Sequence, residues 1–212
     1  MKKVVIVDYG LGNLFSIKQA CLHVGYTPLI SGDKNDIASA DSLILPGVGA
    51  FGVAMKSLRK TSLLDPIKEY ARSGRPLMGV CLGMQLLFDR SEEFGDHEGL
   101  GLIEGSIVRF PSHVNDRQLR VPNIGWHKVY PSSKTSWSNT PLSNINTAGN
   151  HMYFIHSYYA SPKNADNVLS LSTYNDFEYT SAAVQGNTWG FQFHPEKSGE
   201  EGLTIYKNFL SI

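Results

Sequence analysis

The sequence has few cysteines and no long apolar run. Its 212 residues contain only Cys21 and Cys81, and no stretch approaches the 18 or more apolar residues of a membrane-spanning helix. The two cysteines could pair in principle. However, Cys21 lies in a helical pattern, and Cys81 lies in a turn typical of a reactive thiol. We therefore expect a reduced, cytoplasmic protein.

Neither sign of charge is in excess, because 19 Lys and Arg residues balance 19 Asp and Glu residues. This balance leaves no basic surface of the kind that binds nucleic acid. Lys2 and Lys3 precede only four apolar residues before Asp8, which is too short for a signal peptide and favours a first strand over residues 4–7.

Two further signatures are missing. The glycine-containing segment 8–16 fits neither GxGxxG nor GxxxxGK[ST], the two glycine-rich phosphate-binding patterns. The histidines show no metal-ligand spacing with cysteines or carboxylates: His97, His113, His127 and His151. The sequence therefore predicts neither a metal nor a cofactor.

The pattern of elements predicts an α/β fold in one domain over residues 1–212. Strand-like and helix-like segments alternate in the first half, which indicates parallel βα units, whereas short β-like runs in the second half indicate antiparallel additions at one side of the sheet. We expect a mostly parallel central sheet flanked by helices. The expected strands are 4–7, 28–30, 42–45, 77–80, 106–110, 127–130, 152–159, 168–173, 182–185 and 189–194. The expected helices are 13–24, 35–40, 51–59, 63–72 and 199–210, and 132–150 is expected to be an exposed loop.

The most informative segment is Gly79-Val80-Cys81-Leu82-Gly83, between an apolar run and a helical pattern. Glycines on both sides of a nucleophile permit the sharp turn of a nucleophile elbow, here with sulfur in place of oxygen. The start of a helix favours the thiolate form of a cysteine. The alternative is a buried cysteine that only packs before a helix.

His194 and Glu196 follow another apolar run near the C-terminus. If the extended conformation persists, residues two apart project to the same side, so the carboxylate would fix the tautomer of the imidazole. The other ring nitrogen is then free to take a proton from a thiol. A polar cap at a strand end is the alternative. We predict a Cys81–His194–Glu196 catalytic triad.

Other segments supply candidate binding groups. The backbone N–H of Leu82 and the turn formed by Gly47, Val48 and Gly49 are candidate oxyanion donors, although the turn is equally compatible with a purely structural role. Gln85 falls on the same helical face as Cys81. The strand end His156-Ser157-Tyr158 offers several polar groups, for which substrate binding is favoured over a second catalytic histidine.

These residues together resemble the class I glutamine amidotransferases, and within them the glutaminase subunits of imidazole glycerol phosphate synthases. The similarity spans essentially the whole chain and implies a flavodoxin-like fold. Besides the two catalytic motifs, it rests on segments 10–16, 45–51, 124–126, 153–158 and 192–199.

The resemblance implies that Cys81 attacks the side-chain amide of glutamine, that His194 transfers protons, and that Glu196 orients the imidazole of His194. It implies an oxyanion loop at Gly47, Val48 and Gly49. The residues that match the glutamine-binding positions are Gly49, Gln85, His156, Ser157 and Tyr158. The resemblance also implies a partner, a (β/α)₈-barrel cyclase that forms a heterodimer with this chain and receives the ammonia. In histidine biosynthesis this cyclase makes imidazole glycerol phosphate and an aminoimidazole carboxamide ribotide. The positions that match those facing the cyclase are Asn13, Trp126 and Lys197. Asn13 is also a good helix N-cap.

The chain departs from the family pattern around Trp126. It has Asn123-Ile124-Gly125 where the family usually has His-Met-Gly, and His127 where the family has Asn after Gly-Trp. We expect these positions to face the partner, so the departures bear on the acceptor of the ammonia and leave the glutaminase chemistry unaffected. Three alternatives stay open. They are delivery of ammonia to another acceptor such as a nucleotide-sugar, a cysteine hydrolase of peptides or thioesters, and a non-catalytic regulatory subunit. We also expect low activity without the partner, because a glycine-rich oxyanion loop can adopt an unproductive orientation.

Overall fold

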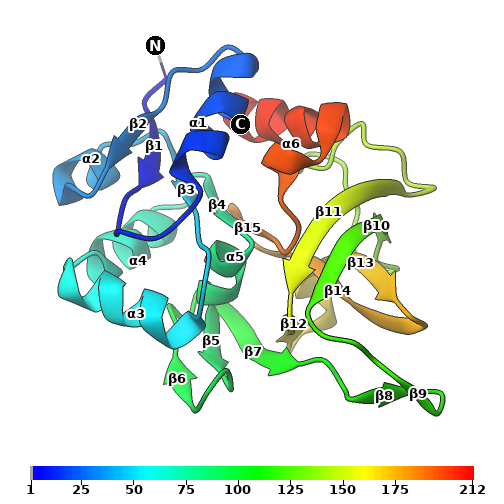
Figure 1. Cartoon of the computed structure of the whole chain (residues 1–212). Helices are drawn as coiled ribbons and strands as arrows, with labels where there is room; N and C mark the ends of the chain where they lie inside the picture. The colour runs from blue at the N-terminus through cyan, green and yellow to red at the C-terminus, as the bar shows by residue number, and fades with distance from the viewer. Residues whose placement is uncertain (1) are drawn as a thin grey trace.

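A computed structural model describes residues 2–212 as a twisted sheet with helices packed on both sides of its parallel half (Figure 1). The helices are α1 Leu14–His23, α2 Lys34–Ala38, α3 Phe51–Lys60, α4 Leu64–Arg72, α5 Leu82–Leu86 and α6 Gly199–Ser211, with short 3₁₀ turns η1 Ala165–Asn167 and η2 Pro195–Lys197. Within the described residues, no helix has the length and apolar character needed to cross a membrane.

The parallel half of the sheet has the strand order β2-β1-β3-β4-β15. These strands are β1 Val4–Val7, β2 Leu29–Ser31, β3 Ser42–Leu45, β4 Leu77–Val80 and β15 Thr188–Phe191. Because the carboxyl ends of parallel strands meet at one edge, the residues after β3, β4 and β15 converge. The turn Gly47–Gly49, which is predicted to bind the oxyanion, follows β3, Cys81 follows β4, and His194 lies shortly after β15.

The sheet continues through strands from the second half of the chain. They are β5 Phe88–Ser91, β6 His97–Glu98, β7 Ile103–Arg109, β10 Asn123–Pro131, β11 Asn150–His156, β12 Tyr158–Pro162, β13 Val168–Tyr174 and β14 Phe177–Gln185. β14 joins β15 in antiparallel fashion and extends the sheet toward β12 and β7, while β10, β11 and β13 form a branch. A two-stranded hairpin, β8 His113–Val114 with β9 Arg117–Gln118, lies apart from this sheet.

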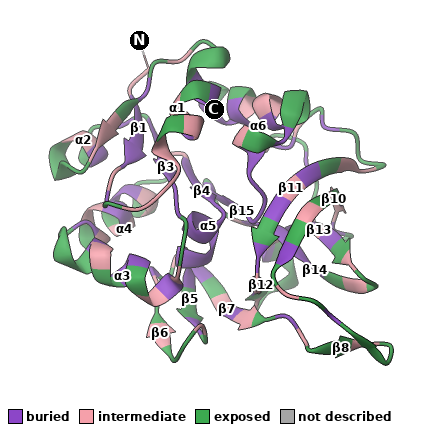
Figure 2. Cartoon of the chain, in the orientation of Figure 1, coloured by how far each residue is buried: buried purple, intermediate pink, exposed green. Residues whose placement is uncertain are grey.

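Alternation along β1 explains why the parallel half has two apolar layers. Successive strand residues point to opposite faces, so Val4 and Ile6 join one buried cluster while Val5 and Val7 join another. The first cluster includes residues of α1 and α6, and the second includes residues of α2, α3 and α4. Figure 2 shows the resulting buried band through the centre of the molecule.

Most predicted elements are confirmed, and strands 4–7, 42–45 and 77–80 have the predicted bounds. The predicted strand 152–159 is wrong in one respect: it divides at Ser157, because β11 pairs with β10 whereas β12 pairs with β7 and β14. The predicted strand 189–194 ends earlier, at Phe191.

The segment 132–149 forms turns rather than regular structure, and β11 begins at Asn150, but the segment is not simply an exposed loop. Trp137, Leu142 and Ile145 are buried in the first apolar cluster, and the indole N–H of Trp137 donates to the carbonyl oxygen of Leu169 at 3.0 Å. These apolar anchors hold the polar segment against the sheet.

Candidate active site

The backbone at Cys81 has the strained geometry expected of a nucleophile elbow. Cys81 has φ +54° and ψ −112° between β4 and α5, a conformation that non-glycine residues rarely adopt. Its N–H donates to the carbonyl oxygen of Phe191 at 2.7 Å, which ties the turn to β15. A Cβ on Gly83 would overlap the carbonyl oxygen of Leu45, so this position requires glycine.

His194 and Glu196 form the second part of the predicted triad. The Nδ1 atom of His194 lies 2.7 Å from Oε1 of Glu196, and both side chains are almost completely buried. The pairing is made through η2 and not along a strand, because Pro195 begins a 3₁₀ turn for which His194 is the N-cap. The expected contact is therefore present, but its predicted extended geometry is wrong.

The charge state of His194 is set by its neighbours. Burial lowers the pKa of His194, but interactions with Cys81 and Glu196 outweigh this effect and raise the pKa to about 10. At neutral pH the imidazole therefore holds a proton, with Glu196 on one side and the sulfur of Cys81 on the other. Such an imidazolium can give its proton to a leaving group while the neighbouring sulfur acts as the nucleophile.

The predicted oxyanion donors lie beside the sulfur. Leu82 is the first residue of α5, where helix geometry leaves the backbone N–H without an intrahelical acceptor. A Cβ on Gly47 would lie 2.6 Å from the backbone nitrogen of Gly83, so the turn packs directly on the elbow. Val48 and Gly49 are exposed, and Gly49 has φ +92° with open space around it. The turn can therefore present its N–H groups or rotate away.

Gln85 and Gln192 form a buried amide pair beneath the nucleophile. The Nε2 group of Gln85 donates to the carbonyl oxygen of Tyr158 and to Oε1 of Gln192, both at 3.0 Å. This leaves the side-chain oxygen of Gln85 to offer to a ligand. The Nε2 atom of Gln192 lies 3.9 Å from the sulfur of Cys81. Sequence reasoning gave Gln192 no role, since it stood inside a run typical of a strand.

A cavity of about 370 Å³ opens at this edge of the sheet. Its lining includes nearly all of the predicted site: Val48, Gly49, Cys81, Leu82, Gln85, Glu93, Pro122, Ile155, His156, Ser157, Tyr158, His194 and Lys197. Glu93 was not predicted. One carboxylate oxygen of Glu93 accepts the N–H of Phe51 at 2.5 Å, where α3 begins directly after the oxyanion turn. Only the folded chain brings Glu93 to the cavity, so no local pattern pointed to it.

His156 lines the cavity but cannot act as a base there. Its Nδ1–H donates to the carbonyl oxygen of Tyr158 at 2.9 Å, and Nε2 accepts from Asn123 at 3.2 Å. Burial, with the nearby His127 and His194, lowers the pKa of His156 to about 3 despite the bond to Tyr158. The neutral ring packs against Phe110 and other aromatic side chains. Its contribution to a ligand is therefore restricted to its ring surface and backbone.

Two of the predicted partner positions, Trp126 and Lys197, lie around Tyr153, and Lys197 lines the cavity. Trp126 is 53% exposed on β10, and its ring contacts Tyr153 of β11 edge-on at 5.9 Å. The Nζ atom of Lys197 lies over the ring of Tyr153, 5.7 Å from the ring centroid. Asn13 precedes α1 but makes no capping hydrogen bond with its side chain, so the structural alternative for Asn13 is not realised.

The departures at Asn123 and His127 do not face the partner, contrary to expectation. Alternate residues of β10 point to opposite sides, so Ile124 and Trp126 are exposed while Asn123 and His127 point inward. Asn123 is fully buried against His156 and Tyr179, and His127 packs on Phe154 and Tyr174. These two departures are changes in the interior.

Among residues 2–212, no group of three or more His, Cys, Asp or Glu side chains is arranged to hold an ion.

The fold and the site have clear relatives. Residues 5–212 match the family model described as glutamine amidotransferase class-I. Imidazole glycerol phosphate synthase subunit HisH 1 of Legionella pneumophila (strain Lens) is 44% identical over 214 residues, covering 100% of both chains. Subunit HisH of Geobacillus thermodenitrificans is 44% identical, covering 100% of this chain and 97% of its own. A chain in the structure of PurLQS from Thermotoga maritima has the same fold, with a TM-score of 0.72, 20% identity, and coverage of 100% and 99%. This chain therefore belongs to the class-I glutamine amidotransferase family.

Proposed function

We propose that this chain is the glutaminase subunit of an imidazole glycerol phosphate synthase and that Cys81, His194 and Glu196 are its catalytic triad. The observation that carries the catalytic assignment is the buried 2.7 Å contact between His194 and Glu196, with the imidazole facing a cysteine on a strained elbow. The 44% identity to HisH subunits over the whole chain supports the choice of pathway, histidine biosynthesis.

The cavity suits a small amino acid with a terminal amide. Cys81 lines it, and the side-chain oxygen of Gln85 and the carboxylate of Glu93 offer acceptors for an ammonium group. Ser157 and Tyr158 also line it, at the turn between β11 and β12. We propose Gly49, Gln85, His156, Ser157 and Tyr158 as the glutamine-binding residues, with Glu93 added to them.

The reaction follows from this geometry. The sulfur of Cys81 attacks the amide carbon of glutamine, and the oxygen that becomes negative is held by the N–H groups of Leu82 and the Gly47–Gly49 turn. His194 gives its proton to the departing nitrogen, which leaves as ammonia. Water, deprotonated by His194, then hydrolyses the thioester and releases glutamate. Glu196 keeps the imidazole oriented throughout.

The exposed apolar residues at the cavity mouth support a partner that covers it. In the ladder between β10 and β11, Ile124 lies opposite Ile155 and Trp126 lies opposite Tyr153. The side chains of Ile124, Trp126 and Ile155 are each at least 42% exposed. Such a patch beside a cavity is typical of a protein interface. We propose that the cyclase subunit docks here, with Asn13, Trp126 and Lys197 at the contact, and receives ammonia from the cavity.

Replacement of Trp126 by alanine is expected to weaken the complex with the cyclase at least about 30-fold, because a large aromatic side chain at an interface centre contributes about 2 kcal/mol or more. Titration calorimetry of the two subunits measures this change. Leu29→Ala is the matched control, since Leu29 is 43% exposed but lies on β2 at the far edge of the sheet. Equal affinities for the two variants would contradict docking at the Trp126 patch.

The proposed function is tested by glutamate release from glutamine, with and without the cyclase and its ribotide substrate. We expect activity to rise at least about 100-fold in the complete mixture, because the exposed Val48–Gly49 segment must adopt its productive orientation and one oxyanion donor contributes about 100-fold or more. Glutamine hydrolysis that ignores the cyclase would favour another acceptor. An inactive wild-type complex would contradict the glutaminase assignment.

Two further assignments are part of this proposal. We propose a cytoplasmic location, supported by the two unpaired cysteines and by the biosynthetic role of the HisH relatives. We also treat residues 1–212 as one amidotransferase domain, because the sheet is continuous between the two halves of the chain and the family model matches residues 5–212.

A further inference from the structure

Two buried polar atoms near the triad have no hydrogen-bond partner. One is Oε2 of Glu196, the carboxylate oxygen that does not contact His194, and the other is the hydroxyl of Tyr206. Both side chains are inaccessible to solvent. A buried polar group without a partner costs about 1–3 kcal/mol, so a matched donor and acceptor close together indicate a function.

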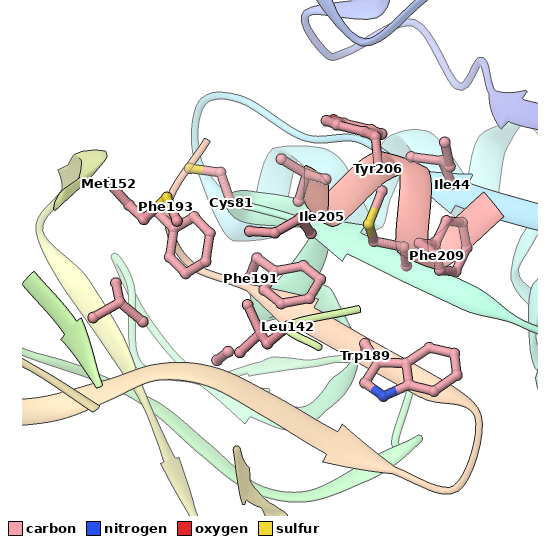
Figure 3. Packing of buried hydrophobic residues seen from close by; sticks show 14 of the residues in the cluster. Ile44, Cys81, Leu142, Met152, Trp189, Phe191, Phe193, Ile205, Tyr206 and Phe209 are labelled. Atoms are coloured by element: carbon pink, nitrogen blue, oxygen red, sulfur yellow. The ribbon is translucent and has the colours of Figure 1, made fainter. Parts of the chain in front are cut away.

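The packing of α6 directs Tyr206 toward Glu196. α6 begins two residues after η2, and at Gly202 it packs so closely on η2 that a Cβ would overlap the carbonyl oxygen of Pro195. Tyr206 lies one helical turn beyond Gly202, on the same face. Figure 3 shows Tyr206 in the buried cluster that also contains Cys81 and Phe193.

The electrostatics of Tyr206 agree with this placement. Burial raises the pKa of Tyr206 most, and the nearby carboxylate of Glu196 raises it further. The thiol of Cys21 faces the same hydroxyl from α1, and burial raises the pKa of that thiol to about 12, so Cys21 is neutral. Glu196 is thus the charged group that the Tyr206 hydroxyl meets.

We propose that Tyr206 is a positioning residue for the triad, whose hydroxyl donates to Oε2 of Glu196 and thereby holds Oε1 against Nδ1 of His194. This inference rests on the proposed function, in which Glu196 orients His194. The phenol does not line the cavity, so it acts through Glu196.

The test removes only the hydroxyl, by Tyr206→Phe. We expect kcat for glutamine in the complete synthase mixture to fall about tenfold with KM unchanged, because the loss of one hydrogen bond to a charged group is worth about a factor of ten. Tyr70→Phe is the matched control. Tyr70 is equally buried, but its hydroxyl donates to the carbonyl oxygen of Pro76 near α4, so activity is expected to stay within twofold.

A second readout does not depend on activity. In NMR spectra of ¹⁵N-labelled protein, the Nδ1–H proton of His194 should move upfield and exchange faster in Tyr206→Phe, and the pKa of His194 should fall, since a loosely held carboxylate supports the imidazolium less. The packing of the ring in the buried cluster, which phenylalanine keeps, would by itself move none of these quantities. An unchanged or raised pKa of His194 would overturn the proposal, as would a kcat within twofold of wild type.

A double-mutant cycle separates this inference from the proposed function. In a Glu196→Gln background, Tyr206→Phe should change kcat less than twofold, because the hydroxyl no longer has a carboxylate to hold. A full tenfold effect in that background would show that Tyr206 acts by another route. If the wild-type protein hydrolyses no glutamine, the proposed function fails, while the NMR comparison still decides whether Tyr206 positions Glu196.

Discussion

Cys81→Ala is expected to abolish glutamine hydrolysis, with a loss of at least about 10⁴-fold. The proposed mechanism passes through a thioester on this sulfur, and Cys81 is the cysteine among the residues that line the cavity. Alanine keeps a Cβ at the strained φ of +54°, so the elbow and the free energy of unfolding should change little. Glutamate release in the complete synthase mixture measures the loss, and thermal unfolding checks the fold.

The other cysteine provides the control. Cys21 is fully buried in α1, and burial raises the pKa of its thiol to about 12, so it has little thiolate at neutral pH. Cys21→Ala should therefore retain activity within about twofold, and iodoacetamide should inactivate this variant as it does the wild type. Substantial glutamine hydrolysis by Cys81→Ala would exclude the thioester route.

The turn at Cys81 was predictable because its signal is local. A buried strand, two glycines around one cysteine and a following helical pattern occur within nine residues, and the packing of Gly83 on Leu45 gives the physical reason for the second glycine. The same pattern did not reveal that α5 ends at Leu86 and that β5 begins at Phe88. Pairing of β5 with the distant β7 overrides the helical propensity of this segment.

The rest of the site depends on contacts between distant parts of the chain. Gln192 reaches Gln85 across 107 positions of sequence, and Glu93 reaches the backbone of Phe51 across 42. The inward direction of Asn123 and His127 depends on the register of β10, which a short motif does not fix. Residue types therefore predicted the chemistry, while the folded chain was needed to identify which side chains support it.

Glu196→Gln is expected to lower kcat about 10³- to 10⁴-fold with little change in KM. An amide cannot replace a carboxylate as the charged acceptor for Nδ1–H, so the imidazole loses both its orientation and the stabilisation of its positive charge. Glu196 does not line the cavity, which is why glutamine binding should survive. Glu200→Gln, the same change at an exposed carboxylate on the first turn of α6, should leave both constants unchanged.

The pH dependence of the same variant has a definite sign. Because Glu196 contributes to raising the pKa of His194 to about 10, its replacement should lower that pKa, which an NMR titration of the imidazole measures. A group whose pKa is raised on folding stabilises the folded state fully below its unfolded pKa, about 6.5 for histidine, and loses this contribution as the pH rises through the folded value. The wild-type protein should therefore exceed Glu196→Gln in free energy of unfolding most clearly near pH 6, and this margin should shrink between pH 6.5 and about 10. A margin that grows over this range would show that the imidazolium is not what Glu196 stabilises.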